Sequence, residues 1–251
     1  MKFQICHLPG SGWSWVSTQR SKPHVLCAPV DFRPVPSDQS STPANAAFAQ
    51  RIGLFGGTFD PPHVGHLVTA INVRHALGLD RVILMVAGQP WQKEGSRSIT
   101  PADDRFAMVE AAVAEVDGLE ASRLEIDRPG PSYTVDTLRD LAAGNPGAQI
   151  FTIFGHDAAA GFTTWHDHQK VAELCHLVVV DRPGETAPLP STFDWLRVEV
   201  PHLDVSSSDL RARVLDGRPL DYLVTQPVLD IIRERDLYAG VDDTSAAKVC
   251  C

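Results

Sequence analysis

The sequence is poor in the cysteine pairs that cross-link secreted proteins or hold structural metals. Its five cysteines are an odd number, and no two of them stand in Cys-x-x-Cys spacing. Neither a disulfide framework nor a zinc ribbon fits this pattern, so the reducing cytoplasm is the expected setting. Long hydrophobic runs are also missing, since no apolar stretch approaches the roughly 20 residues that span a bilayer. We therefore expect a cytoplasmic protein that does not associate with membranes.

Basic residues are outnumbered, with 22 Lys and Arg against 31 Asp and Glu and a formal net charge of -9. A general nucleic-acid binder carries a basic surface, so this balance argues against nucleic acid as a partner. A nucleotide substrate is not excluded, because its pocket needs only local positive groups. The sequence has no Walker A glycine-lysine loop and no Gly-x-Gly-x-x-Gly after a strand. A P-loop enzyme and an ordinary NAD dehydrogenase are therefore excluded.

The first 50 residues differ in composition from the remainder. Pro, Ser, Thr and Gln are frequent from Pro29 to Gln50, and no period of 2 or 3.6 persists there. We expect residues 1-50 to form a disordered or loosely attached extension, residues 51-240 a folded domain and residues 241-251 a C-terminal tail. A targeting peptide is the alternative for the extension, although it lacks a continuous apolar segment and is sparse in basic residues.

Apolar runs of strand length alternate with segments of helical period in the rest of the chain. The expected strands are 52–55, 81–87, 121–126, 149–154, 176–180 and 196–200. The expected helices are 63–77, 100–116 with Thr100 as N-cap, 134–143, 170–174, 206–216 and 227–235. This alternation predicts an α/β fold with a doubly wound parallel sheet. Ligands of such sheets bind beyond the carboxyl ends of the strands.

The most informative stretch is RIGLFGGTFDPPHVGH, residues 51–66. Its short strand breaks at Gly56-Gly57, a turn follows, and His63 and His66 open a helix one turn apart. Free backbone N–H groups and the positive end of a helix dipole meet at such a turn and bind anions. Two histidines there add donors for phosphate oxygens. A zinc-protease pair needs four-residue spacing and an intervening Glu, so the histidines indicate no metal site.

Three further segments are expected at the same edge of the sheet: Gln89–Lys93, Gly155–Asp157 and the serine cluster Ser206–Ser208. Plain structural roles stay open for each. A serine cluster before a helix is commonly an N-cap, and Asp157 can likewise cap the helix that it precedes. Trp165, in a turn, is by spacing alone more often a packing residue.

Two of these motifs resemble the signatures of a known superfamily. Residues 56–66, GGTFDPPHVGH, resemble the first motif of the HxGH nucleotidylyltransferases, and Ser206–Arg211 after Val205 resembles their second motif, I-S-S-T-x-I-R. The segments that are similar to one branch, the bacterial nicotinate mononucleotide adenylyltransferases, are Gly88–Lys93, Pro131–Leu138 and Gly155-x-Asp157 followed by Phe162 and Trp165. The resemblance covers roughly Arg51 to Tyr238. It implies a Rossmann-like nucleotidylyltransferase fold for residues 51-240.

The resemblance also implies an activity, the transfer of an adenylyl group from ATP to nicotinate mononucleotide, and roles for matching residues. His63 and His66 match the catalytic pair, with His66 on the α-phosphate. The implied ATP ligands are Gly56, Gly57, Thr58, Phe59, His66, Lys93, Gly155, Asp157, Ser206, Ser207, Ser208 and Arg211. The implied acceptor contacts are Trp165 on the pyridine ring, Thr134 at its carboxylate and Asp157 at the ribose. Magnesium (Mg²⁺) would arrive with ATP, because no carboxylate cluster promises a protein-built cage.

Physical chemistry agrees with this activity, since the attacking phosphate is already an anion and needs no protein nucleophile or base. The protein must position two anions and stabilise the developing charge. Alternatives are another acceptor, either nicotinamide mononucleotide or phosphopantetheine, and a non-catalytic nucleotide sensor. The intact phosphate donors favour an enzyme, and the Trp165 turn favours a pyridine acceptor. Val205 and Ser208 replace the commoner Ile and Thr, and His156 stands where a small residue is usual. Both a monomer and a homo-oligomer stay open.

Overall fold

The computed structural model describes residues 49–90, 99–181 and 188–240. The predicted N-terminal extension, except for its last two residues, and the predicted tail lie outside the described residues, as does Lys93. No helix within the described ranges is long and apolar enough to cross a bilayer.

The core of the described chain is one parallel sheet of six strands in the order β3-β2-β1-β4-β5-β6. Its strands are β1 (Arg51–Gly57), β2 (Arg81–Val86), β3 (Leu119–Ser122), β4 (Gln149–Phe154), β5 (His176–Asp181) and β6 (Trp195–Glu199). The order runs outward from β1 in one direction and from β4 in the other, which places helices on both faces. The predicted doubly wound parallel sheet is confirmed.

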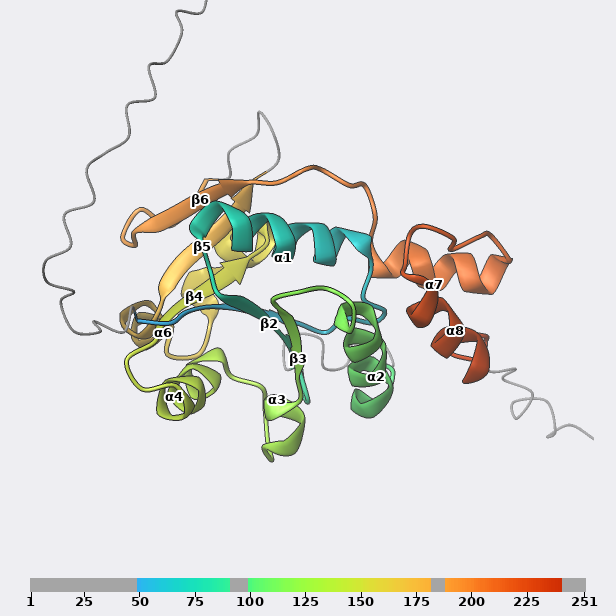
Figure 1. The fold of residues 1–251 in the computed structure, drawn as a ribbon, viewed down its shortest axis with the longest axis horizontal. Coiled ribbons are helices and arrows are strands. Elements are labelled where there is room, and N and C mark those ends of the chain that lie inside the picture. The colour runs from blue at the N-terminus through green and yellow to red at the C-terminus, as the bar shows by residue number, and fades with distance from the viewer. Residues whose placement is uncertain (1–48, 91–98, 182–187, 241–251) are drawn as a thin grey trace, which may run out of the picture. The chain divides into compact units, whose positions relative to one another are not determined.

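Two apolar layers sandwich this sheet. The helices are α1 (Val64–Leu77), α2 (Ala102–Val113), α3 (Leu124–Asp127), α4 (Thr134–Gly144), α5 (His156–Ala160), α6 (His168–Leu174), α7 (Ser207–Asp216) and α8 (Gln226–Glu234), with a 3₁₀ turn, η2, at Phe162–Thr164. One core cluster collects the buried faces of α1, α2, α7 and α8, and the other those of α4, α5 and α6. Figure 1 shows α1 and α4 on opposite sides of the sheet.

The middle strands are buried on both faces, which is why they read as apolar runs and not as alternating patterns. In β1, Ile52 and Leu54 belong to the cluster under α4, whereas Phe55 belongs to the cluster under α1. Burial on both faces holds the strand ends rigidly, so the loops that leave them start from fixed positions.

Three local predictions were wrong. The expected strand 121–126 ends at Ser122, whose Oγ accepts the N–H of Leu124 at 3.3 Å, and α3 follows. The second helix begins at Ala102 with Pro101 as N-cap, and the carbonyl of Thr100 instead accepts a bond from Arg105 at 2.8 Å. The first strand continues through the glycine pair to Gly57, because its pairing with β2 extends that far.

Candidate active site

A cavity of about 250 Å³ opens at the carboxyl ends of β1 and β4. These are the two strands between which the strand order reverses, the position at which doubly wound sheets bind ligands. Its wall is formed by Leu54, Phe55, Gly56, Gly57, Thr58, Ala87, Pro90, Glu125, Ser132, Tyr133, Thr134, Thr152, Ile153, Phe154, Gly155, Ala158, Trp165 and His166. Six of the residues predicted from the sequence are among them: Gly56, Gly57, Thr58, Thr134, Gly155 and Trp165.

The turn after β1 directs its aromatic side chain inward. Phe59 has a positive φ of 49° and is 3% exposed. Its ring meets Phe55 and His66 edge-on, with centroids 5.9 Å and 5.0 Å away. Since the ring is part of the core, Phe59 can offer a phosphate only its main-chain N–H.

The two histidines lie at the N-terminus of α1. His63 is the N-cap and His66 the third residue of the helix, and their rings stack with centroids 3.7 Å apart. The backbone N–H of His63 donates to Nδ1 of His66 at 3.1 Å. An imidazole that accepts at Nδ1 carries its proton on Nε2 when neutral, so this bond selects the tautomer of His66.

His63 is a neutral, buried imidazole. Its side chain is 9% exposed, and burial lowers its pKa from 6.5 to about 4. Within the described ranges, its Nδ1 has no hydrogen-bond partner. Gly65 makes room for the ring, because a Cβ there would lie 3.0 Å from this nitrogen and 3.1 Å from Cγ1 of Val205. The first motif thus packs against the second at a place where any larger residue would push on His63 and Val205.

The second motif opens α7 beside the same turn. Ser206 is the N-cap, and its Oγ accepts the N–H of Asp209 at 3.2 Å. Oγ of Ser207 donates to the carbonyl of Pro61 at 2.8 Å, and Nη1 of Arg211 donates to the carbonyl of Asp60 at 2.7 Å. These bonds hold two helix N-termini, those of α1 and α7, next to each other. Each presents first-turn N–H groups that have no intrahelical acceptor.

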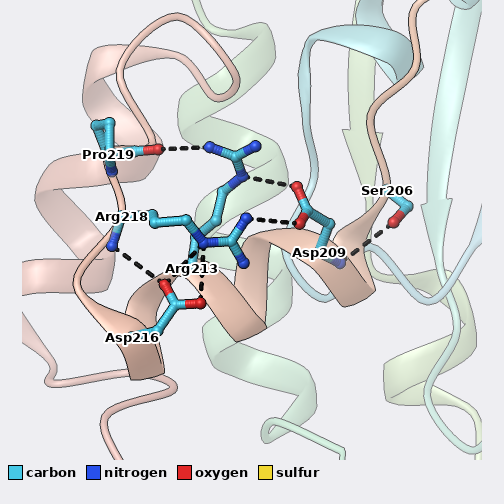
Figure 2. A network of polar contacts seen from close by, with 6 residues as sticks. All are labelled: Ser206, Asp209, Arg213, Asp216, Arg218 and Pro219. Atoms are coloured by element: carbon cyan, nitrogen blue, oxygen red, sulfur yellow. Dashed lines mark hydrogen bonds and ion pairs between the residues drawn. The ribbon is translucent and has the colours of Figure 1, made fainter.

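A charged network braces the outer side of α7 (Figure 2). Asp209 accepts from Nε of Arg213 at 2.6 Å and from Arg218 at 3.3 Å. The hydrogen bond from Arg213 holds the pKa of Asp209 below its usual value. Arg218 also binds Asp216, and Arg213 reaches the carbonyl of Pro219. The network ties α7 to the loop after it.

The turn is anchored from the C-terminal side as well. The hydroxyl of Tyr238 donates to Oδ1 of Asp60 at 2.8 Å, and Asp60 is 1% exposed. Burial, followed by the charge of Asp60, raises the pKa of Tyr238, so it stays a donor. Sequence reasoning missed this contact, since nothing in the local pattern links residues 178 positions apart.

The other end of the cavity is aromatic. The ring centroids of Trp165 and Phe154 lie 5.1 Å apart. Tyr133 stacks on His166, with ring centroids 4.2 Å apart. The sequence assigned no role to either His166 or Tyr133. Thr134, at the start of α4, places the amino end of a helix at this wall.

The remaining predicted residues are spread around the cavity. His63, His66, the serines and Arg211 surround the Asp60-Pro61 turn, outside the cavity wall. Asp157 is exposed in the first turn of α5, between the wall residues Gly155 and Ala158. In the part of the chain that the structure describes, no group of three or more His, Cys, Asp or Glu side chains could hold a metal ion.

Comparisons with known proteins show which proteins the chain is similar to. A family model described as cytidylyltransferase-like matches residues 54–213. A protein of Streptomyces coelicolor named "Probable nicotinate-nucleotide adenylyltransferase" is 49% identical over 188 residues, 74% of this chain and 99% of the relative. One of the same name from Corynebacterium kroppenstedtii is 45% identical over 205 residues, 79% and 96% of the two chains.

Solved structures share the fold at lower identity. The nicotinic acid mononucleotide adenylyltransferase of Plasmodium falciparum, in complex with NaAD, superposes with a TM-score of 0.63 at 16% identity. The superposition covers 75% of this chain and 97% of that one. At this identity the likeness concerns the arrangement of strands and helices.

Proposed function

Because this chain belongs to the cytidylyltransferase-like family and, within it, to the nicotinate-nucleotide adenylyltransferases, we propose that it transfers the adenylyl group of ATP to nicotinate mononucleotide. The products are nicotinate adenine dinucleotide and pyrophosphate. The protein is thus a nucleotidyltransferase of NAD biosynthesis, and we place its reaction in the cytoplasm.

The observation that carries the proposal is the junction of the two motifs beside the cavity. The bonds from Ser207 to Pro61 and from Arg211 to Asp60 bring the N-termini of α1 and α7 to one turn. Two helix N-termini aimed at one place suit a polyanion, because backbone N–H groups and both dipoles attract negative charge there. A triphosphate at this junction would have the aromatic cavity next to its α-phosphate for the acceptor.

The chemistry requires positioning and charge stabilisation. A phosphate oxygen of the mononucleotide forms a bond to the α-phosphorus, and the bond from that phosphorus to the oxygen leading to the β-phosphate breaks in line. The leaving pyrophosphate takes the electron pair, and no proton has to move. In the proposal, His66 donates from Nε2 to an oxygen of the α-phosphate, as its tautomer allows.

His63 acts as a neutral donor in this scheme, because its pKa of about 4 keeps it uncharged at pH 7. Positive character then comes from the helix N-termini and from the cations around ATP. Arg211 and the serines stabilise the β- and γ-phosphates. The triphosphate lies along Gly56, Gly57, Thr58 and the N–H of Phe59. Lys93 is proposed as a further cation from its sequence match alone.

Magnesium enters as part of the MgATP substrate. Phosphate oxygens and water suit Mg²⁺, which keeps several waters and needs few protein carboxylates. In the proposal the phosphates and water hold the ion, so no cage of protein carboxylates is required. The ion neutralises charge on the phosphates when it is bound.

The acceptor occupies the aromatic end in this proposal. Trp165 stacks on the pyridine ring, and the start of α4 at Thr134 faces its carboxylate. Asp157 accepts from the ribose hydroxyls. Phosphopantetheine has no aromatic ring for Trp165, which is why a pyridine mononucleotide is preferred here.

The test is pyrophosphate release from MgATP with three acceptors offered separately: nicotinate mononucleotide, its amide and phosphopantetheine. We expect the acid to be used with the highest kcat/KM. Equal or zero turnover on all three would contradict the assignment. ATP binding without pyrophosphate release under any condition would instead favour the nucleotide sensor. Sedimentation of the same preparation would distinguish a monomer from a homo-oligomer.

A further inference from the structure

We propose that Arg105 and Ser132 are positioning residues. Together they set the distance between the turn after β1 that would bind the ATP phosphates (the phosphate turn, residues 58–62) and the loop before α4 on the acceptor side (the acceptor loop, residues 131–133). They act through the residues that follow β2. This inference rests on the proposed function, because it concerns the geometry of that reaction. Arg105 lies outside the segments that carry the family resemblance, whereas Ser132 lies in one of them, Pro131–Leu138, which assigned it no role.

Arg105 is a charged side chain in the interior, 2% exposed, on the second turn of α2. Its Nη1 donates to the carbonyl of Thr58 at 2.9 Å and to the carbonyl of Ala87 at 2.7 Å. Thr58 belongs to the phosphate turn and Ala87 follows β2, and both line the cavity. One guanidinium nitrogen therefore joins the carboxyl ends of two adjacent strands.

Burying a charged guanidinium group costs desolvation free energy, which its hydrogen bonds must offset. The carbonyls of Thr58 and Ala87 extend beyond the paired part of the strands, and such partly buried carbonyls need a donor. The planar fork of arginine supplies several donors with fixed relative directions, which an ammonium group on a flexible stem does not. Arg105 thus fixes where the phosphate turn stands relative to β2.

Ser132 makes the second link. Its Oγ accepts the N–H of Gly88 at 2.9 Å and that of Gln89 at 3.2 Å, and its own N–H donates to the carbonyl of Gln89 at 3.1 Å. Ser132 precedes Tyr133 and Thr134 on the acceptor side of the cavity. The acceptor loop is therefore bonded to the residues that directly follow Ala87.

The segment that follows β2, between the two links, is tightly packed. A Cβ at Gly88 would lie 2.5 Å from the carbonyl oxygen of Glu125, so the backbone of this segment packs directly against the backbone of Glu125. One connected path therefore runs along the cavity. It leads from Thr58 through Arg105, the residues that follow β2 and Ser132 to Thr134. In-line attack needs the reacting atoms about 3–3.5 Å apart, and a displacement of about 1 Å costs on the order of 10²-fold in rate. Loosening either link should therefore lower kcat.

The experiment measures kcat, both KM values and thermal stability for Arg105→Lys, Ser132→Ala and the double variant. Calorimetry adds the affinity of each variant for a non-hydrolysable ATP analogue and for nicotinate mononucleotide, each alone. We expect kcat to fall by about tenfold to a hundredfold in each single variant. Each substrate by itself should bind nearly as before, because its own subsite is intact. The double variant should lose less than the product of the single losses, since both act on one path.

Arg81→Lys is the matched control for the arginine. Arg81 stands at the opposite, amino end of β2, where it bonds to Asn145 and Glu120. The Arg81→Lys variant should have an unchanged kcat, even if its melting temperature is lower. Ser132→Thr keeps a hydroxyl and should restore most of the rate lost in Ser132→Ala. If Arg105→Lys does not fold, the comparison of Ser132→Ala with Ser132→Thr still tests the proposal.

Three results would overturn the inference: unchanged kcat in Ser132→Ala, losses that multiply in the double variant, or a loss for Arg81→Lys equal to that for Arg105→Lys. A wild-type protein that makes no dinucleotide from any acceptor would refute the proposed function instead. The two failures are therefore told apart by the wild-type assay.

Discussion

Oγ of Ser207 donates a hydrogen bond to the carbonyl oxygen of Pro61 at 2.8 Å, although the two lie 146 positions apart along the chain. Pro61 belongs to the turn after β1, and Ser207 is the first residue of α7. The bond uses up the hydroxyl, so Ser207 contributes to an anion site through its main-chain N–H and through the placement of its helix. Nη1 of Arg211 likewise binds the carbonyl of Asp60, with one of its two N–H groups.

Replacing Ser207 should therefore affect the ATP side. Ser207→Ala removes one hydrogen bond, worth about 1 kcal/mol, and we expect KM for ATP to rise by roughly fivefold while KM for the mononucleotide stays constant. Steady-state kinetics with one substrate varied at a time checks this. Ser207→Thr retains the hydroxyl and is the control. A rise in the KM for the mononucleotide alone would contradict the assignment of α7 to ATP.

His66→Ala should lower kcat by about two orders of magnitude or more, because one placed donor to the reacting phosphate is lost. The fold should be retained, since His66 is only partly buried and lies in the first turn of α1. The control is His75→Ala, at the other end of α1, where the side chain is exposed. Equal kcat in the two variants would remove His66 from the catalytic group.

The stability of the protein should depend on pH through His63. The unfolded chain binds a proton near the ordinary value of 6.5, whereas the folded chain does so only near 4. Stability is therefore full above pH 7 and falls as the pH drops from about 6.5 to 4, by about 3 kcal/mol. Urea unfolding at several pH values measures it. His63→Asn should flatten this part of the curve, and His75→Asn should not.

Trp165→Ala should raise KM for nicotinate mononucleotide by roughly tenfold, because stacking on a base is worth about 1–3 kcal/mol. The KM for ATP should stay constant, and Trp165→Phe should recover part of the loss. Fluorescence and thermal unfolding report the fold. An unchanged acceptor KM together with a collapsed fold would make Trp165 a packing residue only.

Tyr238→Phe should destabilise the protein by about 1–3 kcal/mol, because the buried carboxylate of Asp60 loses a donor. Chemical denaturation measures the change. Tyr222→Phe is the matched control, since Tyr222 is 94% exposed and should leave the free energy of unfolding unchanged. Equal values for the two variants would show that the hydroxyl of Tyr238 contributes nothing to stability.

The middle strands of the sheet could be predicted from the sequence because burial on both faces makes them apolar runs. The run Gln149–Phe154 was predicted with the bounds that β4 has. The run 121–126 was predicted as one strand, whereas the chain leaves β3 at Ser122 and Glu125, in α3, is buried with a hydrogen bond from Thr137 at 2.6 Å. Sequence patterns of hydrophobicity carry no record of such a partner.

What the sequence determined by itself is the local chemistry: the glycine pair, the histidines one turn apart and the serines before a helix. Each is a short-range pattern whose physical meaning depends only on neighbouring residues. Tertiary structure alone decided that these segments meet, that His63 is buried and neutral, and that Arg105 lies beneath the phosphate turn. Burial and hydrogen bonding between distant segments depend on how strands and helices pack, and packing depends on the whole chain.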